Sequence, residues 1–219
     1  MRHFLTASLL GLTLLGCQPS VPRVAVEDIP APANATVVLK LGDNLRAVGA
    51  AAYGHERFSG FVARLNGIAD PERVMAGATL KLPSLSIAFR DAGLDPRYQP
   101  AINVLAKSCT DFHAVLPAYL NARNASGIGA GHFAISSDLQ RKLTACADGI
   151  DAACRVLRSP PAPHAAPKMT IAQFTQVSDG IRELARGSID GYGYDYDLVG
   201  QRFGLAFTNA IVWTQSGHR

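Results

Sequence analysis

The sequence has little that would support binding to nucleic acid. The chain holds 21 lysine and arginine residues against 17 aspartate and glutamate residues, so its formal net charge is only +4. It contains no basic stripe and no stacking motif of the kind that nucleic-acid binders carry. We therefore expect no nucleic-acid partner, although a mild positive charge eases approach to acidic polymers or lipids.

The sequence also lacks the residue patterns of familiar enzymes. Beyond position 83 the only glutamate is Glu183, and the neighbouring Arg182 and Arg186 favour a solvated ion pair over the raised-pKa acid of a glycosidase. The histidines are too scattered for a zinc site, and no Gly-x-Ser-x-Gly motif is present. Cys109 and His113 form the only nearby Cys–His pair. We expect no metal and no cofactor, and favour binding over catalysis.

Long apolar runs are almost confined to the N-terminus. Residues 4–15 are nearly all apolar, but this run is too short for a permanent membrane helix and suits the core of a signal peptide. A second stretch, Leu198–Trp213, is interrupted by Arg202 and Asn209 and predicts a buried helix instead. We therefore expect export without a membrane-spanning helix.

The first apolar run ends in Gly16-Cys17, a small residue followed directly by cysteine. This resembles the lipobox of bacterial lipoproteins, whose cysteine is acylated and becomes the new N-terminus. The resemblance implies a signal peptide over residues 1–16 and lipidation at Cys17, which anchors firmly when several acyl chains are attached. Because Gln18 is not aspartate, the enterobacterial sorting pattern implies the outer membrane, facing the periplasm. The alternative is an ordinary secretory signal that contains a cysteine.

A linker and a small compact unit follow the cysteine. Residues 17–35 are rich in proline and small residues, which predicts an extended linker. The unit at residues 36–83 predicts the order strand, helix, helix, strand. Its apolar positions alternate first, then recur at helical spacing, and alternate again; they are Val37, Leu39, Leu41, then Leu45, Val48, Ala52, then Phe58, Phe61, Val62, Leu65, and finally Leu80 and Leu82. Asp43 or Asn44 can cap the first helix, which Gly54 should end.

Four fragments of this unit, in order, resemble a LysM domain. They are Gly42-Asp43-Asn44-Leu45, Tyr53-Gly54, Asn66-Gly67-Ile68, and the run from Gly77 to Pro83. Two positions depart from the family pattern, because Asn44 replaces the usual threonine or serine and Arg46 stands where many bacterial members carry an aromatic residue. The resemblance covers less than a quarter of the chain.

The resemblance implies binding to glycans that contain N-acetylglucosamine, here peptidoglycan. The expected groove has one wall of Gly42, Asp43, Asn44 and Leu45 and another of Asn66, Gly67, Ile68 and Ala69. Glycines allow the backbone to approach a ligand, the polar side chains supply hydrogen bonds, and Ile68 can pack against an acetyl methyl group. The simpler interpretation is that the two segments only start and end helices, and both interpretations can hold together.

Residues 84–219 predict an all-α bundle of four to five helices, so the fold class is α+β. Pro117 should kink or restart a helix, residues 121–136 should form a loop, and Ser137 should begin a capping box with Gln140. Further helices are expected around Ile171–Leu184, ended by Gly187, and over Leu198–Trp213. In the last helix Gly200 and Gly204 permit a close crossing, and the core positions are Phe203, Phe207 and Ile211. Asp190–Asp197 predicts a solvated tyrosine-rich loop.

Three cysteines remain after Cys17, and an odd number leaves one unpaired. Gly149 can stop one helix and Asp151 can cap the next, which would bring Cys146 and Cys154 together. On one unbroken helix they would be about 12 Å apart, too far to bond. The spacing resembles the cysteine pair of disulfide-closed Sel1-like repeats, and we expect a Cys146–Cys154 disulfide. The alternative is a bond between Cys109 and either of them.

These observations predict a membrane-anchored envelope lipoprotein that binds peptidoglycan, with a helical adaptor domain for an unknown protein partner. Two alternatives remain. One is a wall-remodelling enzyme with uncatalogued chemistry in residues 84–219. The other is a degenerate LysM domain that serves only protein contacts, which Asn44 and Arg46 make reasonable.

Overall fold

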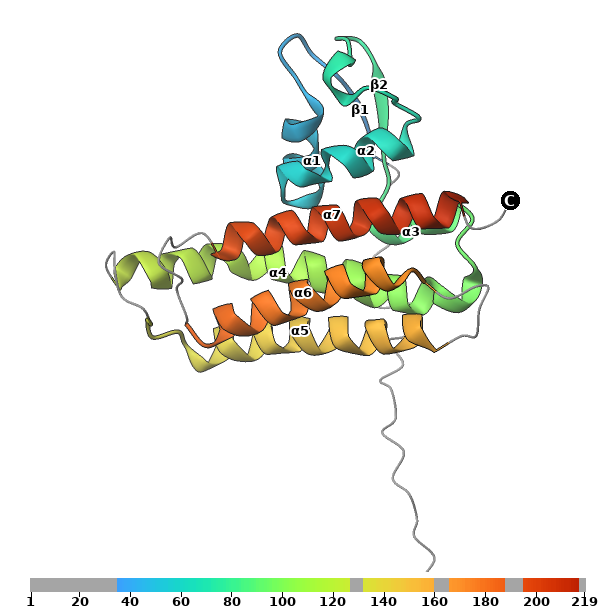
Figure 1. The fold of residues 1–219 in the computed structure, drawn as a ribbon. Coiled ribbons are helices and arrows are strands. Elements are labelled where there is room, and N and C mark those ends of the chain that lie inside the picture. The colour runs from blue at the N-terminus through green and yellow to red at the C-terminus, as the bar shows by residue number, and fades with distance from the viewer. Residues whose placement is uncertain (1–34, 127–131, 160–165, 188–194, 217–219) are drawn as a thin grey trace, which may run out of the picture.

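The computed structural model describes residues 35–126, 132–159, 166–187 and 195–216. Its class is mixed α+β, as predicted: a small two-stranded antiparallel sheet and mostly helices. Figure 1 shows a small N-terminal module standing on one side of a bundle of long helices. No helix in these four ranges is long and apolar enough to cross a membrane.

The N-terminal module, residues 35–82, has the predicted strand–helix–helix–strand order. Its elements are β1 (Ala35–Val38), α1 (Leu45–Tyr53), α2 (Ser59–Leu65) and β2 (Thr79–Leu82), with short 3-10 turns η2 (Glu56–Phe58) and η3 (Pro71–Arg73). The strands are antiparallel, with Val37 opposite Leu80. Asn44 caps α1, since its Oδ1 accepts a hydrogen bond from the Ala47 N–H at 2.9 Å, and Gly54 ends α1 with a φ of 90°. Both helix boundaries were predicted.

The first strand is shorter than its sequence pattern predicted. Leu39 lies just beyond β1 and is buried, but Leu41 is 95% exposed. The alternation therefore stops at Leu39, where the chain turns toward Gly42. Because of this turn, the Leu41 side chain lies on the surface, although the alternating pattern placed it in the core.

The C-terminal part holds five helices in the described residues, in agreement with the predicted bundle. They are α3 (Leu85–Asp91), α4 (Gln99–Ala125), α5 (Ser137–Arg158), α6 (Lys168–Ala185) and α7 (Asp195–Ser216), with a 3-10 turn η4 (Pro96–Tyr98) before α4. Helices α4 to α7 pack in sequence order. The predicted core faces of α6 and α7 are buried, and Gly187 follows α6 with a φ of 65°.

The sequence misplaced two helix boundaries in this bundle. Helix α4 continues through Pro117 to Ala125, so the helix does not restart at Pro117 and the predicted loop start at residue 121 is wrong. Pro117 lies on an exposed face while Tyr119 and the preceding turns are buried, so packing holds the helix together. The cap of α5 is Ser136 rather than Ser137, because its Oγ accepts from the Leu139 N–H at 3.2 Å.

The predicted helix break at Gly149 is wrong, and with it the Cys146–Cys154 disulfide. Both cysteines lie on the unbroken helix α5 and are free thiols, eight residues apart. Gly149 instead lets α5 approach α4, since a Cβ there would lie 2.8 Å from the Ser108 Oγ. Asp151 does not cap a helix but pairs with Arg182 of α6 at 2.5 Å.

Aromatic side chains join the module to the bundle in one continuous core. Phe58 and Phe61 of the module are fully buried, and both contact Phe207 of α7 with ring centroids 5.9 and 6.4 Å away. Phe207 also contacts Phe89 of α3 and Phe174 of α6. The predicted glycines make this approach possible, because a Cβ at Gly204 would lie 2.7 Å from the Arg57 carbonyl carbon.

Candidate functional site

The two predicted groove walls belong to neighbouring connections of the N-terminal module. Residues 42–44 lie in the β1–α1 connection with Leu45 opening α1, and residues 66–69 follow α2 and lead to η3. The β1–α1 connection and η3 lie at the end of the module that faces away from the bundle (Figure 1). Arg46 of α1 and Glu72 of η3 form an exposed ion pair at 3.7 Å, which joins the helix after the first wall to the 3-10 turn after the second.

The first connection uses its polar side chains to hold its own turn. Asp43 accepts a hydrogen bond from the Lys40 N–H at 2.8 Å through Oδ2, and Asn44 caps α1. Leu45 is 2% exposed and belongs to the core, so its side chain does not line the surface. What this wall presents to a ligand is its backbone and the second carboxylate oxygen of Asp43.

Asn66 braces the second connection against the sheet. Its Nδ2 donates to the carbonyl oxygens of Val62 and Lys81 at 2.9 and 3.0 Å, and its Oδ1 accepts from the Lys81 N–H at 2.7 Å. The side-chain amide of Asn66 thus forms hydrogen bonds with the edge of β2, as the backbone of a third strand would. Because both hydrogens of the amide are donated within the module, the main role of Asn66 is structural.

The residues after Asn66 form a helix end with an open backbone. Gly67 has a φ of 64°, and the Ile68 N–H donates to the Ala63 carbonyl at 2.9 Å. Ile68 is half-buried against the core and Ala69 is exposed. A Cβ at Gly67 or Gly42 would meet no atom within 4 Å, so another molecule can approach the backbone at both walls.

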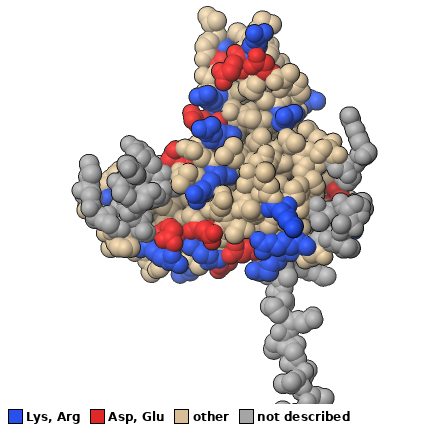
Figure 2. All heavy atoms as spheres, in the orientation of Figure 1, with Lys and Arg blue, Asp and Glu red and all other residues tan. Residues whose placement is uncertain are grey.

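Charged side chains of both signs surround these connections. The basic side chains are Lys40, Arg46, Arg64, Arg73 and Lys81, and the acidic ones are Asp43, Asp70 and Glu72. Arg73 pairs with Asp70 at 3.2 Å, beside the Arg46–Glu72 pair. Figure 2 shows acidic and basic side chains side by side at this end of the module. A surface of this kind suits a neutral ligand with hydrogen-bonding groups better than a strongly charged one.

An apolar rim, formed by Val38, Leu41 and Met75, borders the same end, and the sequence did not single it out. The three side chains are 56%, 95% and 79% exposed. Backbone hydrogen bonds of Leu39 with Gly77 and Ala78, at 2.8 and 2.9 Å, hold the loops that carry them together. The only sequence signal was Leu41, which the alternating pattern assigned to the core.

A second polar cluster lies where the module meets the bundle. The Nδ1 of His55 accepts from the Arg57 N–H at 3.0 Å, so its Nε2 carries the proton and donates to Asp197 of α7 at 3.2 Å. Gln201 donates to the other Asp197 oxygen at 2.9 Å. Both ring nitrogens of His55 are therefore engaged, which suits a structural joint better than a catalytic base.

His113 of α4 lies beside this joint. A Cβ on Gly54 would lie 2.5 Å from the His113 ring, and the ring's Nε2 is buried with no hydrogen-bond partner among the described residues. Burial, and secondarily the neighbouring His55, lowers the pKa of His113 to about 4. Burial also raises the pKa of Cys109, opposite to the change that activates a cysteine nucleophile. The Cys109–His113 pair thus lacks the electrostatics of a Cys–His catalyst.

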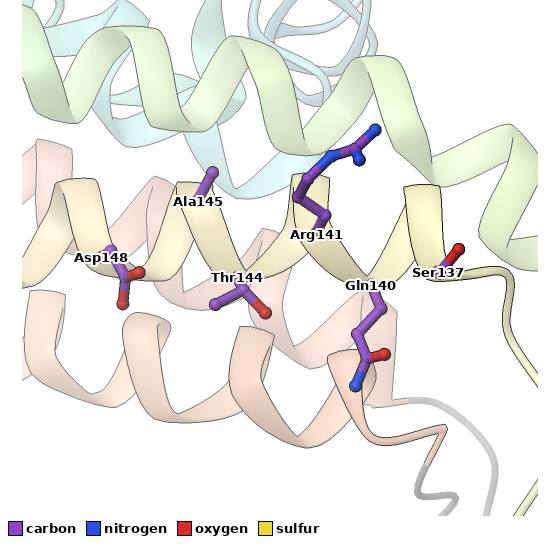
Figure 3. Close-up of a pocket in the computed structure, with 6 residues that line it drawn as sticks. All are labelled: Ser137, Gln140, Arg141, Thr144, Ala145 and Asp148. Atoms are coloured by element: carbon purple, nitrogen blue, oxygen red, sulfur yellow. The ribbon is translucent and has the colours of Figure 1, made fainter.

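A shallow depression runs along the outer face of α5. It is lined by Ser137, Gln140, Arg141, Thr144, Ala145 and Asp148, all from this one helix. In Figure 3 the Arg141 and Gln140 side chains point in opposite directions rather than toward a common centre. The depression therefore does not assemble converging polar groups, which small-molecule sites require.

Comparisons with known proteins assign no family to this arrangement. No protein-family profile, no curated protein and no solved structure matches the chain. The predicted lipidation site Cys17 and residues 190–194 of the predicted tyrosine-rich loop lie outside the described residues. The rest of that predicted loop, Asp195–Asp197, is wrong as a loop, because it forms the first turn of α7. The candidate site is therefore defined by the geometry of the N-terminal module.

Proposed function

We propose that the chain is an envelope lipoprotein that binds peptidoglycan through a LysM-like module at residues 36–83. The observation that supports this proposal is the strand–helix–helix–strand module, in which an ion pair between Arg46 of α1 and Glu72 of η3 joins the elements that follow the two glycine-containing connections, residues 42–45 and 66–69. These are the connections that form the sugar groove in the LysM family, which the sequence fragments resemble.

The chemistry of the exposed end supports a neutral acetylated sugar as ligand. Open backbone at Gly42 and Gly67 supplies hydrogen bonds, and charged side chains of both signs lie around them. Ile68 offers an apolar contact for an acetyl methyl group. Because Asn44 caps α1 and Asn66 braces β2, their contribution to binding is to hold the backbone in place.

Anchoring at Cys17 would place this module within reach of the wall. Residues 18–34 are rich in proline, and 17 residues span at most about 60 Å when fully extended. The helical bundle would then serve as an adaptor for a protein partner. Incorporation of labelled palmitate tests the anchor: we expect label on the natural chain and none on Cys17→Ala, and unlabelled natural chain would refute it.

Co-sedimentation with purified insoluble peptidoglycan tests the glycan-binding proposal. We expect the full chain to sediment and Ala69→Tyr, which fills the groove from an exposed position, to stay in solution. Ala145→Tyr is the matched control, since it places the same side chain in the depression on α5. If the folded natural chain stays in solution, glycan binding is refuted. If Ala69→Tyr sediments like the natural chain, the groove is wrongly placed.

The apolar rim supports a second candidate, in which the module contacts a protein. Val38, Leu41 and Met75 are exposed apolar side chains on loops that backbone hydrogen bonds hold together, and exposed apolar groups occur at many protein interfaces. A double change of Leu41 and Met75 to serine distinguishes the two functions. Loss of sedimentation with peptidoglycan would assign the rim to the glycan site, whereas unchanged sedimentation would leave the rim for a protein partner.

A further inference from the structure

The three described cysteines are buried thiols on two neighbouring helices. Cys109 lies on α4, and Cys146 and Cys154 lie about two turns apart on α5. Cys154 faces α6, since its Sγ lies 4.0 Å from the carbonyl oxygen of Ile171. Cys154 is thus turned away from α4, and the remaining combination is Cys109 with Cys146.

Gly149 fixes the register of α5 against α4. A Cβ at Gly149 would lie 2.8 Å from the Ser108 Oγ and 3.5 Å from the Val104 Cγ1, so Gly149 stands opposite the turn from 104 to 108. The two helices pack against each other, and Figure 1 shows that they run antiparallel. Cys146 lies one turn before Gly149 on the same face. It therefore stands opposite the next turn of α4, which contains Cys109.

The electrostatic surroundings of the two thiols agree with this register. Burial is the main cause that raises the pKa of Cys146 to about 11, and Asp111 and Lys107 also act on it. These two residues lie on either side of Cys109 along α4. Burial likewise raises the pKa of Cys109, with Cys146 as the second cause. The Cys146 thiol thus lies near enough to Cys109 to affect its pKa.

We propose that Cys109 and Cys146 form a disulfide that joins α4 to α5 when the chain folds in the presence of a disulfide oxidant. The S–S bond of the oxidant breaks as the protein S–S bond forms. The protein loses two electrons, the oxidant is reduced to two thiols, and the two protein thiol protons pass to them. Such oxidants act in the compartments to which exported proteins are delivered.

The same burial determines when the bond forms. A pKa of about 11 against the ordinary 9.0 leaves Cys146 with about a hundredfold less of the reactive thiolate. Both side chains are also shielded, at 2% and 4% exposed. The bond therefore forms while the chain folds, and the folded reduced protein resists oxidation.

Refolding in a mixture of reduced and oxidised glutathione tests this proposal independently of glycan binding. The full chain carries Cys17→Ala so that three cysteines remain, and it is refolded from denaturant and alkylated without reduction. We expect one alkylated cysteine, Cys154, and a mass lower by two hydrogen atoms before alkylation. Three alkylated cysteines at every glutathione ratio would overturn the proposal.

Two variants assign the bond, because trypsin leaves Cys146 and Cys154 on one peptide, residues 143–155. In Cys154→Ser we expect the disulfide to persist and to join this peptide to residues 108–123. In Cys146→Ser we expect no disulfide. A bond that disappears in Cys154→Ser would overturn the assignment. A thiol oxidation rate of the folded protein equal to that of the unfolded chain would contradict formation during folding.

Discussion

Asn66 uses both hydrogens of its side-chain amide inside the module. It connects the end of α2 to the backbone of Lys81, at the open edge of β2. The sequence placed Asn66 in a ligand groove, but only the folded chain brings Lys81 beside it, 15 residues later. A loss of glycan binding in an Asn66 variant would therefore mix two causes, and Ala69 is the better position to probe.

We expect Asn66→Ala to lower the free energy of unfolding by about 1–3 kcal/mol, since it removes three partly exposed hydrogen bonds. Asn66→Asp keeps the acceptor for the Lys81 N–H but loses both donors, so its loss should be intermediate. Urea unfolding measures both variants. Unchanged stability in Asn66→Ala would show that water replaces the amide without cost.

His113 should make the protein sensitive to acid. Its pKa is lowered to about 4 from 6.5, chiefly by burial and then by His55. Between pH 6.5 and pH 4 the unfolded chain binds a proton here that the folded chain does not, so stability falls as the pH falls through this window. The full loss is about 3 kcal/mol.

The measurement compares urea unfolding at pH 7 and pH 4.5 for the natural chain and His113→Phe, which packs a ring that does not titrate. We expect the natural chain to lose more stability than the variant over this interval. The carboxylates of the protein contribute equally to both, so the difference isolates His113. Equal losses would contradict the assignment.

At the scale of elements, periodicity and caps predicted the helices that depend on local sequence. The N-cap Asn44 and the terminating Gly54 predicted the bounds of α1, and the apolar stripe from Ile171 to Leu184 predicted α6. The failures share one physical cause. Gly149 and Pro117 favour a helix break locally, but packing against neighbouring helices keeps α5 and α4 intact.

In the candidate site, too, the sequence predicted the local features and missed the contacts between distant segments. The sequence located both connections, because glycines and caps mark them locally. It missed the joint of His55 and Asp197, which lie 142 positions apart. It also missed the apolar rim, because Leu41 fits an alternating strand until the chain turns. Contacts between distant segments carry no local signal in one sequence.

The crossing of α7 over the module depends on Gly204. A Cβ there would lie 2.7–2.9 Å from the carbonyl carbon, Cβ and carbonyl oxygen of Arg57. We expect Gly204→Ala to push the module from α7 and lower the free energy of unfolding by about 1–3 kcal/mol. Leu205→Ala, at the adjacent half-exposed position, is the control and should change it by roughly 0.5 kcal/mol or less. Thermal unfolding that ranks the two variants equally would contradict the close crossing.

At the scale of the whole molecule, the module and the bundle share one core. Phe58 and Phe61 are fully buried only because Phe207 and Phe89 cover them. Removing the bundle would expose both rings and much of the aromatic cluster. The module is thus held in a fixed place on the bundle, with its exposed end directed away from α7 (Figure 1).

We expect the module and the bundle to unfold together in one transition. Trp213, the only tryptophan, reports on the bundle, and hydrogen exchange at Leu39 and Leu80 reports on the module. Both should give the same free energy of unfolding, because neither part buries its core alone. A module that loses protection well before the tryptophan signal changes would show that the two parts are independent.

The central claim is that the connections at residues 42–45 and 66–69 form a glycan site. The most direct measurement is an NMR titration of the 15N-labelled chain with soluble oligomers of N-acetylglucosamine. We predict dose-dependent amide shifts at Gly42, Asp43, Gly67 and Ala69, with little change in α5 and α6. Absence of shifts at saturating oligomer, or shifts confined to the helical bundle, would contradict the claim.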